Sequence, residues 1–274
     1  MPQPPIRIEP IAAALGAEVS GVDLAQPLDA ETRRAIEAAW TRHQVLFFRD
    51  QDITAAQHKA FARHFGELHV HPVLPSLAAQ GHPEVVVLES SEQAPYVADS
   101  WHSDVTFERR PPLGSVLRGV VIPEAGGDTM WSSMYAAYDA LSDTMQRLLG
   151  ELRAVHDGGA FRAVASEEQK RELGKDETTI HPVIRTHPVS GRKSIFVNST
   201  FTRRIKGMRR RESEALLHFL FEHVGAPEFT CRFRWRPNSI AMWDNRCTQH
   251  RVVADNVRAP RRMERVTICG DAPV

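Results

Sequence analysis

The chain has 274 residues, of which 42% are hydrophobic and 25% are charged. This balance is typical of a soluble globular protein and excludes a disordered or collagen-like chain. Lys and Arg together number 34, as do Asp and Glu, so the formal net charge is zero. A nucleic acid or an anionic membrane is therefore not expected as a partner, and a small molecule is favoured.

The cysteine content and the first residues indicate the compartment. Cys231, Cys247 and Cys269 lie 16 and 22 residues apart and form no CxxC pair, so neither a disulfide framework nor a cysteine zinc site is predicted. The N-terminus shows no targeting pattern, and no apolar stretch is long enough to span a membrane. We expect a cytoplasmic protein, and we expect it to form a homo-oligomer.

In the first quarter of the chain, strand and helix patterns alternate. Helical spacing after Asp29 predicts a helix over about 30–43. Thr54 and Gln57 have the spacing of a capping box, so a second helix is expected from there to about residue 65, where Gly66 ends it. Short apolar runs predict strands at 6–11, 17–24 and 45–48.

From residue 84 onward, short strand patterns dominate, with helix patterns only at about 134–149 and 211–224. The strands are predicted at 84–88, 101–107, 114–122, 194–197, 229–235, 240–243 and 265–269. Without regular alternation of strands and helices, this order favours a mainly β fold with flanking helices, a sandwich or jelly roll. We expect a single domain over 1–274, in which the polar stretch at about 158–180 is either a lid or an ordinary insertion.

A histidine and an aspartate stand two residues apart in the predicted strand at 101–107. Residues i and i+2 of a strand share a face, so His102 and Asp104 are expected to present an imidazole and a carboxylate side by side, as a metal ion requires. The pair alone is equally consistent with a surface ion pair. His250, in the segment WDNRCTQHR, would complete two histidines and one carboxylate, the facial triad of non-haem Fe(II).

Such an iron site would carry a net charge of +1, which favours a dianionic chelating co-substrate. The far carboxylate of that co-substrate needs a partner of its own. Arg261, eleven residues after His250, offers a planar fork for it, and Thr129 could donate a hydroxyl to the same oxygens. Because Arg262 follows directly, the sequence does not decide which of these two arginines binds the far carboxylate.

Several segments, in one order along the chain, carry a family resemblance. They are GAEVSGVDL, VLFFRDQ, FGELHVHP, WHSDVTF, GGDTMW, HPVIRTHPVSG, WDNRCTQHR and RVTICGDAP. The chain resembles the taurine dioxygenase family, the Fe(II)- and 2-oxoglutarate-dependent oxygenases that include alkylsulfatases and aryloxyalkanoate dioxygenases. The resemblance implies a catalytic domain with a double-stranded β-helix, Fe(II) held by His102, Asp104 and His250, and 2-oxoglutarate anchored by Arg261 and Thr129.

The resemblance also implies the reaction. Oxidative decarboxylation of 2-oxoglutarate with O2, giving succinate and CO2, is coupled to hydroxylation of the substrate carbon next to a heteroatom. The product then collapses to an aldehyde or ketone and a released anion or phenol. A zinc hydrolase and a non-catalytic sandwich with a structural ion are the other interpretations of the donor set.

Substrate residues carry over from the family one by one. His71 and Arg265 match residues that hold the sulfonate in the taurine enzymes, and Phe161 and Phe201 match aromatic residues that wall the substrate. An anionic organic substrate is therefore expected.

Two positions depart from the family pattern. Leu74 and Ala98 stand where the taurine enzymes place a tyrosine and an asparagine near the substrate amine. An ammonium group against these apolar side chains would lose its hydrogen bonds, which costs on the order of several kcal/mol. Alkyl sulfonates and alkyl sulfate esters, from which sulfite or sulfate is released, are favoured; taurine and aryloxyalkanoates are the alternatives.

Overall fold

The computed structural model describes residues 5–71, 73–94, 98–162, 165–172 and 178–274. Within these ranges, no helix combines the length and apolar character needed to cross a membrane. The stretch at 158–180, predicted to be a lid or an ordinary insertion, falls partly outside them, at residues 163–164 and 173–177.

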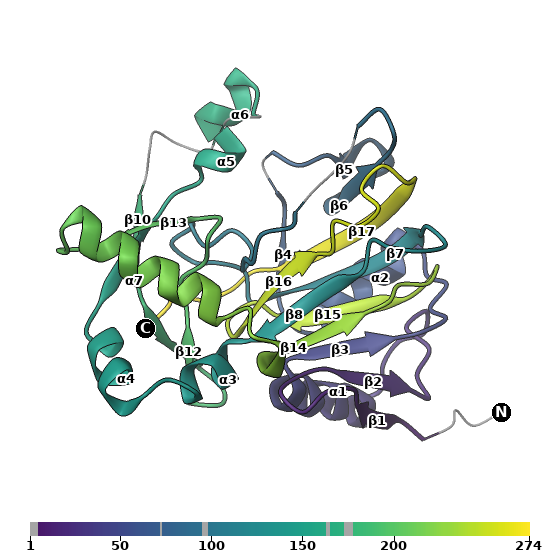
Figure 1. The fold of residues 1–274 in the computed structure, drawn as a ribbon. Helices are drawn as coiled ribbons and strands as arrows, with labels where there is room; N and C mark the ends of the chain where they lie inside the picture. The colour runs from purple at the N-terminus through teal and green to yellow at the C-terminus, as the bar shows by residue number, and fades with distance from the viewer. Residues whose placement is uncertain (1–4, 72, 95–97, 163–164, 173–177) are drawn as a thin grey trace.

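The largest element is a nine-stranded sheet in the order β1-β2-β3-β15-β7-β17-β6-β5, with β4 pairing with β17 (Figure 1). Its strands are β1 (Arg7–Pro10), β2 (Ala17–Ser20), β3 (Val45–Phe48), β4 (Leu68–His69), β5 (Ser76–Leu77), β6 (His82–Ser90), β7 (Gly114–Val121), β15 (Ile240–Asp244) and β17 (Arg261–Ile268). All its pairings are antiparallel except β2 with β3. Strands distant in the chain are neighbours, as a jelly roll requires.

A second, three-stranded sheet in the order β14-β8-β16 packs against the inner face of the large one. Its strands are β14 (Thr230–Phe233), β8 (Thr129–Ser133) and β16 (Thr248–Val252). The core between the sheets contains Phe47, Trp243 and Met263 from the large sheet and Trp131 and Phe233 from the small one. Two facing β layers around one apolar core confirm the mainly β, jelly-roll architecture that the sequence predicts.

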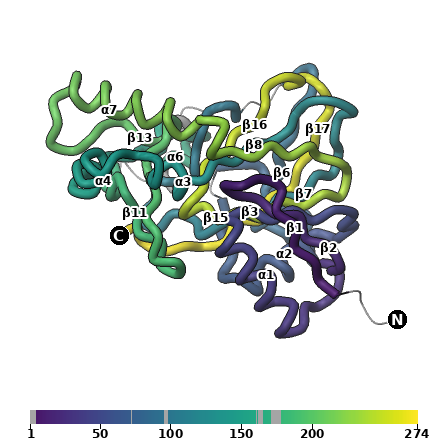
Figure 2. Tube along the Cα trace, turned by 60° about the horizontal axis from the view of Figure 1, so that its bottom comes forward, coloured from purple at the N-terminus to yellow at the C-terminus, as the bar shows by residue number. Residues whose placement is uncertain are grey.

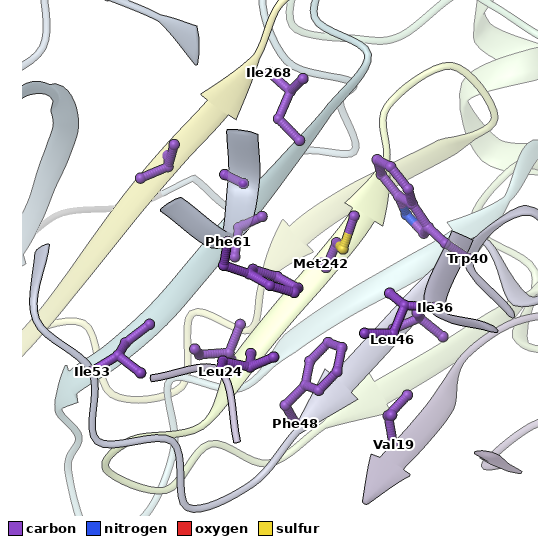
Figure 3. Packing of buried hydrophobic residues seen from close by; sticks show 14 of the residues in the cluster. Val19, Leu24, Ile36, Trp40, Leu46, Phe48, Ile53, Phe61, Met242 and Ile268 are labelled. Atoms are coloured by element: carbon purple, nitrogen blue, oxygen red, sulfur yellow. The ribbon is translucent and has the colours of Figure 1, made fainter. Parts of the chain in front are cut away.

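The outer face of the large sheet is covered by helices α1 (Ala30–His43) and α2 (Ala55–Arg63), whose apolar sides form a second core (Figure 3). The four residues of strand β3 are all apolar because the strand lies between two cores. Leu46 and Phe48 pack under the helices, whereas Val45 and Phe47 belong to the core between the sheets. A strand buried on both faces loses the usual alternation of polar and apolar residues.

The remaining elements build a flank at the end of the jelly roll where the small sheet lies. Figure 2 shows α3, α4 and α7 gathered on that side, away from α1 and α2. The helices are α3 (Met134–Asp139), α4 (Asp143–Gly150), α5 (Gly159–Arg162), α6 (Glu167–Glu172) and α7 (Arg210–His223), with the short 3₁₀ turn η2 (Pro227–Phe229). A second 3₁₀ turn, η1 (Ala78–Gln80), lies between β5 and β6 at the edge of the large sheet. The strands are β9 (Arg153–His156), β10 (Thr179–Pro182), β11 (Ile184–Thr186), β12 (Lys193–Ile195) and β13 (Thr202–Ile205).

The predictions for α1, α2 and β3 are confirmed, together with both N-terminal caps. The Asp29 carboxylate accepts the N–H of Thr32 over 2.7 Å, and Thr54 and Gln57 form the reciprocal capping box. Other predicted strands are also found, with ends that differ by a few residues; they are β1, β2, β6, β7, β12, β14, β15 and β17.

Two predictions about local structure are wrong, those for 134–149 and 101–107. The predicted helix over 134–149 is two helices, because the Ser142 hydroxyl accepts the N–H of Met145 and starts α4 anew. The polar stretch at 158–180 contains α5, α6 and the start of β10 among its described residues, and whether it is a lid or an ordinary insertion stays a prediction. The segment 101–107 is not a strand: it makes one isolated bridge at His102 and then turns.

Candidate active site

Two histidines face each other across a backbone pairing. His102, in the segment before β7, and His250, in β16, exchange backbone hydrogen bonds of 3.1 and 2.8 Å, and their rings lie 4.2 Å apart. His102 Nδ1 lies 2.9 Å from the carbonyl oxygen of Ser100, which can only accept. The proton of the neutral ring is therefore on Nδ1, and the Nε2 lone pair is left free for a metal.

Asp104 reaches the same place from a tight turn instead of a strand. Val105, the next residue, has φ 53°, a left-handed conformation that is costly for a β-branched side chain. The Asn245 side chain holds this turn: its Oδ1 accepts the N–H of Asp104 over 2.6 Å, and its Nδ2 donates to the carbonyl oxygens of Asp104 and Pro112. His102 and Asp104 are neighbours, as expected, but they are brought together by a turn and not by a strand. The Asn245 side chain, 141 residues away in the chain, holds this turn.

The ligand atoms of His102, Asp104 and His250 all lie within 4.8 Å of one another. Nε2 of His102 and Nε2 of His250 stand 3.9 and 4.0 Å from Asp104 Oδ1, so the three atoms converge. Two neutral imidazoles and a carboxylate are the donor set of non-haem Fe(II) sites with open positions. The residues present fit such an ion.

Burial sets the protonation states at this site. It lowers the pKa of His102 and lowers that of His250 to about 3, so both rings are neutral near pH 7. Burial by itself would raise the pKa of Asp104, but Arg265 and the two histidines outweigh it, and the net shift is downward. All three side chains are thus in the form that binds a cation.

A second buried group, His187, Asp244 and Cys247, also has its ligand atoms within 4.8 Å. Here the carboxylate is already bound by Arg246 through two hydrogen bonds of 2.6 and 2.9 Å. His187 Nδ1 accepts two backbone N–H groups, so its Nε2 carries the proton and donates to Asp244 over 3.0 Å. With no free lone pair on the imidazole, and with the pKa of Cys247 raised by burial, this group is a hydrogen-bonded network.

The two neighbouring arginines of β17 point to opposite faces. Arg261 is buried and lies on the inner face with Met263 and Arg265. Arg262 lies on the outer face, where it forms ion pairs with Glu89 and Glu264. The structure therefore places Arg261, and not Arg262, on the side of the metal-ligand residues.

Thr129, the other residue predicted to bind the co-substrate, begins β8 and is 2% exposed. Gly127, two residues earlier, lies against Arg261: a Cβ at Gly127 would be 3.4 Å from both Cδ and Nε of the arginine. Arg261 of β17 thus contacts the chain two residues before Thr129, at the start of β8. The sequence did not reveal that the indole Nε1 of Trp235 donates to Thr129 Oγ1 over 2.9 Å.

His71 lies in the loop before β5. Its hydrogen bonds show which ring nitrogen carries the proton. Nδ1 accepts the backbone N–H groups of Val73 and Leu74, each over 3.1 Å, so the neutral ring carries its proton on Nε2. Burial, followed by the charge of Arg265, lowers the pKa of His71 to about 3. Nε2 is buried and has no hydrogen-bond partner among the described residues. It is therefore a neutral donor ready for an acceptor.

Arg265 lies between this histidine and the metal-ligand residues. Its Nη1 donates to Asp104 Oδ1 over 2.8 Å, and Ser115 Oγ donates to the other carboxylate oxygen over 3.2 Å. The guanidinium is 6% exposed and its Nε has no partner among the described residues. A cation and a neutral donor thus stand near the metal-ligand carboxylate.

Aromatic rings wall the same space. Phe161 of α5 lies 5.0 Å from the His71 ring and stacks on Phe201 at 5.9 Å, as centroid distances. Phe107, which the sequence analysis did not single out although it ends the segment WHSDVTF, contacts both at 5.8 and 5.4 Å. The predicted aromatic residues are brought together, and a third ring joins them.

The two apolar departures are held through backbone hydrogen bonds to segments that carry His71 and His250. Leu74 is half-buried and hydrogen bonds to His71 through its backbone N–H. Ala98 is half-buried too, and its carbonyl accepts the N–H of Val252, two residues after His250. The side chain of Gln169, in α6, donates to the carbonyl of Val73 over 3.1 Å, so the 158–180 segment contacts the loop that carries His71.

Comparison with known proteins gives consistent matches over nearly the whole chain. The family model described as taurine catabolism dioxygenase TauD, TfdA family, matches residues 7–267. An alpha-ketoglutarate-dependent sulfate ester dioxygenase of Pseudomonas putida is 39% identical over 277 residues, which cover 97% of this chain and 90% of that protein. An alkylsulfatase of Acinetobacter baylyi is 36% identical over 280 residues, with coverages of 98% and 87%.

The fold is similar to solved structures as well. A crystal structure of a taurine dioxygenase from Burkholderia xenovorans matches with a TM-score of 0.85 and 40% sequence identity. The match covers 99% of this chain and 93% of that one.

Proposed function

The chain belongs to the TauD, TfdA family and is a 2-oxoglutarate-dependent dioxygenase, and from this premise we propose that it acts on small alkyl sulfate esters without an amine. The observation that best supports this substrate class is the presence of His71 and Arg265 in the site. A neutral Nε2–H and a guanidinium, both buried, offer only donors, so they complement a head group that has only acceptors.

We propose that His102, Asp104 and His250 hold the Fe(II) that the family implies. When bound, this ion activates O2 for hydroxylation of a substrate C–H bond, coupled to decarboxylation of 2-oxoglutarate to succinate. The protein's own contribution is placement. The Ser100 carbonyl orients the His102 ring and Asn245 holds the backbone of Asp104.

Arg261 and Thr129 are proposed to bind the distal carboxylate of 2-oxoglutarate. Both are buried, and a charge-assisted pair is stronger away from water than at the surface. The neighbouring Gly127 lies against the arginine side chain, where a Cβ would be in van der Waals contact with it at 3.4 Å. A zinc hydrolase and a non-catalytic sandwich do not describe the family to which the chain belongs.

The tail of the substrate is proposed to lie against Leu74, Ala98, Phe161 and Phe201. Each Å² of apolar area buried there contributes about 25 cal/mol, whereas an ammonium group would find no partner on the leucine or alanine side chain. The name of the Pseudomonas putida relative specifies a sulfate ester, and that of the Acinetobacter baylyi relative an alkylsulfatase. These names favour the sulfate ester over the sulfonate.

The proposed reaction places one oxygen atom of O2 in the substrate and the other in succinate. Insertion of one oxygen atom of O2 into the C–H bond next to the ester oxygen gives a hydroxylated ester. The C–O bond then breaks, so that the carbon becomes an aldehyde and the sulfate leaves with the electron pair, while the hydroxyl proton goes to water. The other oxygen atom enters succinate as 2-oxoglutarate loses CO2.

The test is to measure succinate and sulfate, or sulfite, from the Fe(II)-loaded enzyme with hexyl sulfate, hexanesulfonate, taurine and phenoxyacetate. We expect the highest kcat/KM for hexyl sulfate and at least about tenfold less for taurine, because a buried unpaired polar group costs ~1–3 kcal/mol and a charge more. If taurine or phenoxyacetate is the best substrate, the proposed substrate class is wrong.

Two variants separate head-group from tail recognition. His71→Phe removes the neutral donor and should raise KM for every anionic substrate, with the KM for 2-oxoglutarate unchanged. The double change Leu74→Tyr with Ala98→Asn should shift preference toward taurine and leave the 2-oxoglutarate KM unchanged. Arg265 is the less useful probe, because its replacement would also remove the ion pair with Asp104.

A further inference from the structure

The hydroxyl of Thr129 has one hydrogen-bond partner among the described residues, and that partner makes its oxygen an acceptor. Nε1 of Trp235 donates to Thr129 Oγ1 over 2.9 Å. An indole N–H can only donate, so the threonine oxygen is the acceptor whichever way its own proton points. The Thr129 proton must therefore find its acceptor elsewhere.

Both side chains are buried, at 2% exposure for Thr129 and 4% for Trp235. A buried O–H without an acceptor is unfavourable, and a ligand carboxylate would supply one. The geometry beside it suits such a group, since Gly127, two residues before Thr129, lies against the Arg261 side chain.

We propose that Trp235 is a positioning residue for 2-oxoglutarate: by donating to Thr129 Oγ1, its indole orients the hydroxyl so that the Thr129 O–H donates to the distal carboxylate. The inference rests on the proposed role of Thr129 and Arg261. The alternative is that Trp235 only fills space, because it also packs on Phe233 at 5.0 Å and on Trp131 at 6.4 Å between ring centroids.

Trp235→Phe removes the N–H and keeps an aromatic ring. In the Mn(II)-loaded enzyme, isothermal titration calorimetry should show a three- to tenfold weaker Kd for 2-oxoglutarate, roughly what weakening of one hydrogen bond to a charged group costs. The affinity for Mn(II) should not change, and neither should that for a 2-oxo acid without a distal carboxylate, such as 2-oxobutyrate. A loss of packing alone would not discriminate between these three ligands.

Trp40→Phe is the matched control. Trp40 is 5% exposed, its Nε1 has no hydrogen-bond partner among the described residues, and it projects from α1 into the core on the outer face of the large sheet, away from Thr129. This variant should lose packing comparable to that lost in Trp235→Phe and bind 2-oxoglutarate with the wild-type Kd. Equal weakening in both variants would overturn the inference.

A double-mutant cycle with Thr129→Val separates the inference from the proposal on which it rests. Thr129→Val should weaken 2-oxoglutarate binding by about tenfold or more, and adding Trp235→Phe should then cost nothing further. If Thr129→Val has no effect, the proposed role of Thr129 falls and the inference with it. If Thr129→Val weakens binding but Trp235→Phe does not, or if the two effects add, only the inference falls.

A measurement on the wild-type chain does not depend on the folding of any variant. In protein labelled with ¹⁵N-tryptophan and loaded with Zn(II), the Trp235 indole N–H should be protected from exchange, and its resonance should shift on addition of 2-oxoglutarate but not of 2-oxobutyrate. An unprotected Trp235 indole, or equal shifts with both acids, would contradict the inference.

Discussion

Neighbouring residues of one strand can have unrelated roles, because successive side chains point to opposite faces. In β17 this separates Arg261, which is buried beside Gly127, from Arg262, which pairs with Glu89 and Glu264 on the other face. The sequence does not show which of the two arginines faces the site. The register of β17 in the sheet does.

We expect Arg261→Ala to raise the KM for 2-oxoglutarate by at least about 100-fold, because loss of one partner of a buried charge pair costs several kcal/mol. Arg262→Ala is the matched control and should leave this KM within about twofold, since it removes ion pairs on the outer face. Steady-state succinate formation at varied 2-oxoglutarate measures both. The reverse result would assign the co-substrate to Arg262.

At the scale of elements, the site depends on how closely β7, β15 and α1 approach one another. Gly114, the first residue of β7, pairs with Asp244 at the end of β15 and lies under the ring of Trp40 from α1. An added Cβ would meet the carbonyl oxygen of Trp243 and come within 2.6 Å of the Trp40 ring. The absence of a side chain here lets three elements meet beside the turn that carries Asn245.

Gly114→Ala is therefore expected to lower the free energy of unfolding by about 1–3 kcal/mol or more, because backbone and a packed ring cannot both move aside. Gly150→Ala is the control: a Cβ there meets nothing within 4 Å, and at the end of α4 alanine should be neutral or stabilise by about 0.5–1 kcal/mol. Urea denaturation followed by circular dichroism distinguishes the two. A Gly114→Ala protein as stable as wild type would contradict the packing described.

At the scale of the whole molecule, buried histidines link stability to pH. Burial lowers the pKa of His58 to about 4, and lowers the pKa values of His71 and His156 to about 3. In the unfolded chain a histidine titrates near pH 6.5. Between these values the unfolded state binds more protons than the folded state, so stability falls as the pH falls.

For the metal-free protein we expect the free energy of unfolding to decrease by at least about 4 kcal/mol between pH 7.5 and pH 5.5, since each of these three histidines contributes roughly 1.4 kcal/mol over that interval and the lowered pKa values of His102 and His250 act in the same direction. Asp104 and Asp244, whose pKa values are lowered in the fold, lose their contribution only as the pH falls below about 4. Urea titrations at the two pH values test this. An unfolding midpoint that does not move over that range would contradict the burial of these side chains as neutral groups.

Local features of the fold could be predicted because they are encoded in consecutive residues. The capping box of Thr54 and Gln57 and the apolar run of β3 depend on neighbours within a turn or a strand. Prediction failed where a distant contact overrides the local pattern. The segment 101–107 reads as a strand, but hydrogen bonds from Asn245 hold it as a turn.

The sequence by itself determined the polar residue types of the site, through three histidines, one aspartate, two arginines and a threonine in segments that resemble one family. Only the tertiary structure decided how they act together, because the contacts join residues far apart in the chain. Arg265 and Asp104 are 161 positions apart, Asn245 and Asp104 are 141, and Trp235 and Thr129 are 106. Such partners are chosen when the two sheets pack and the strand register is set. Linear spacing therefore indicates which chemistry is possible, and the packed sheets decide which side chains carry it out.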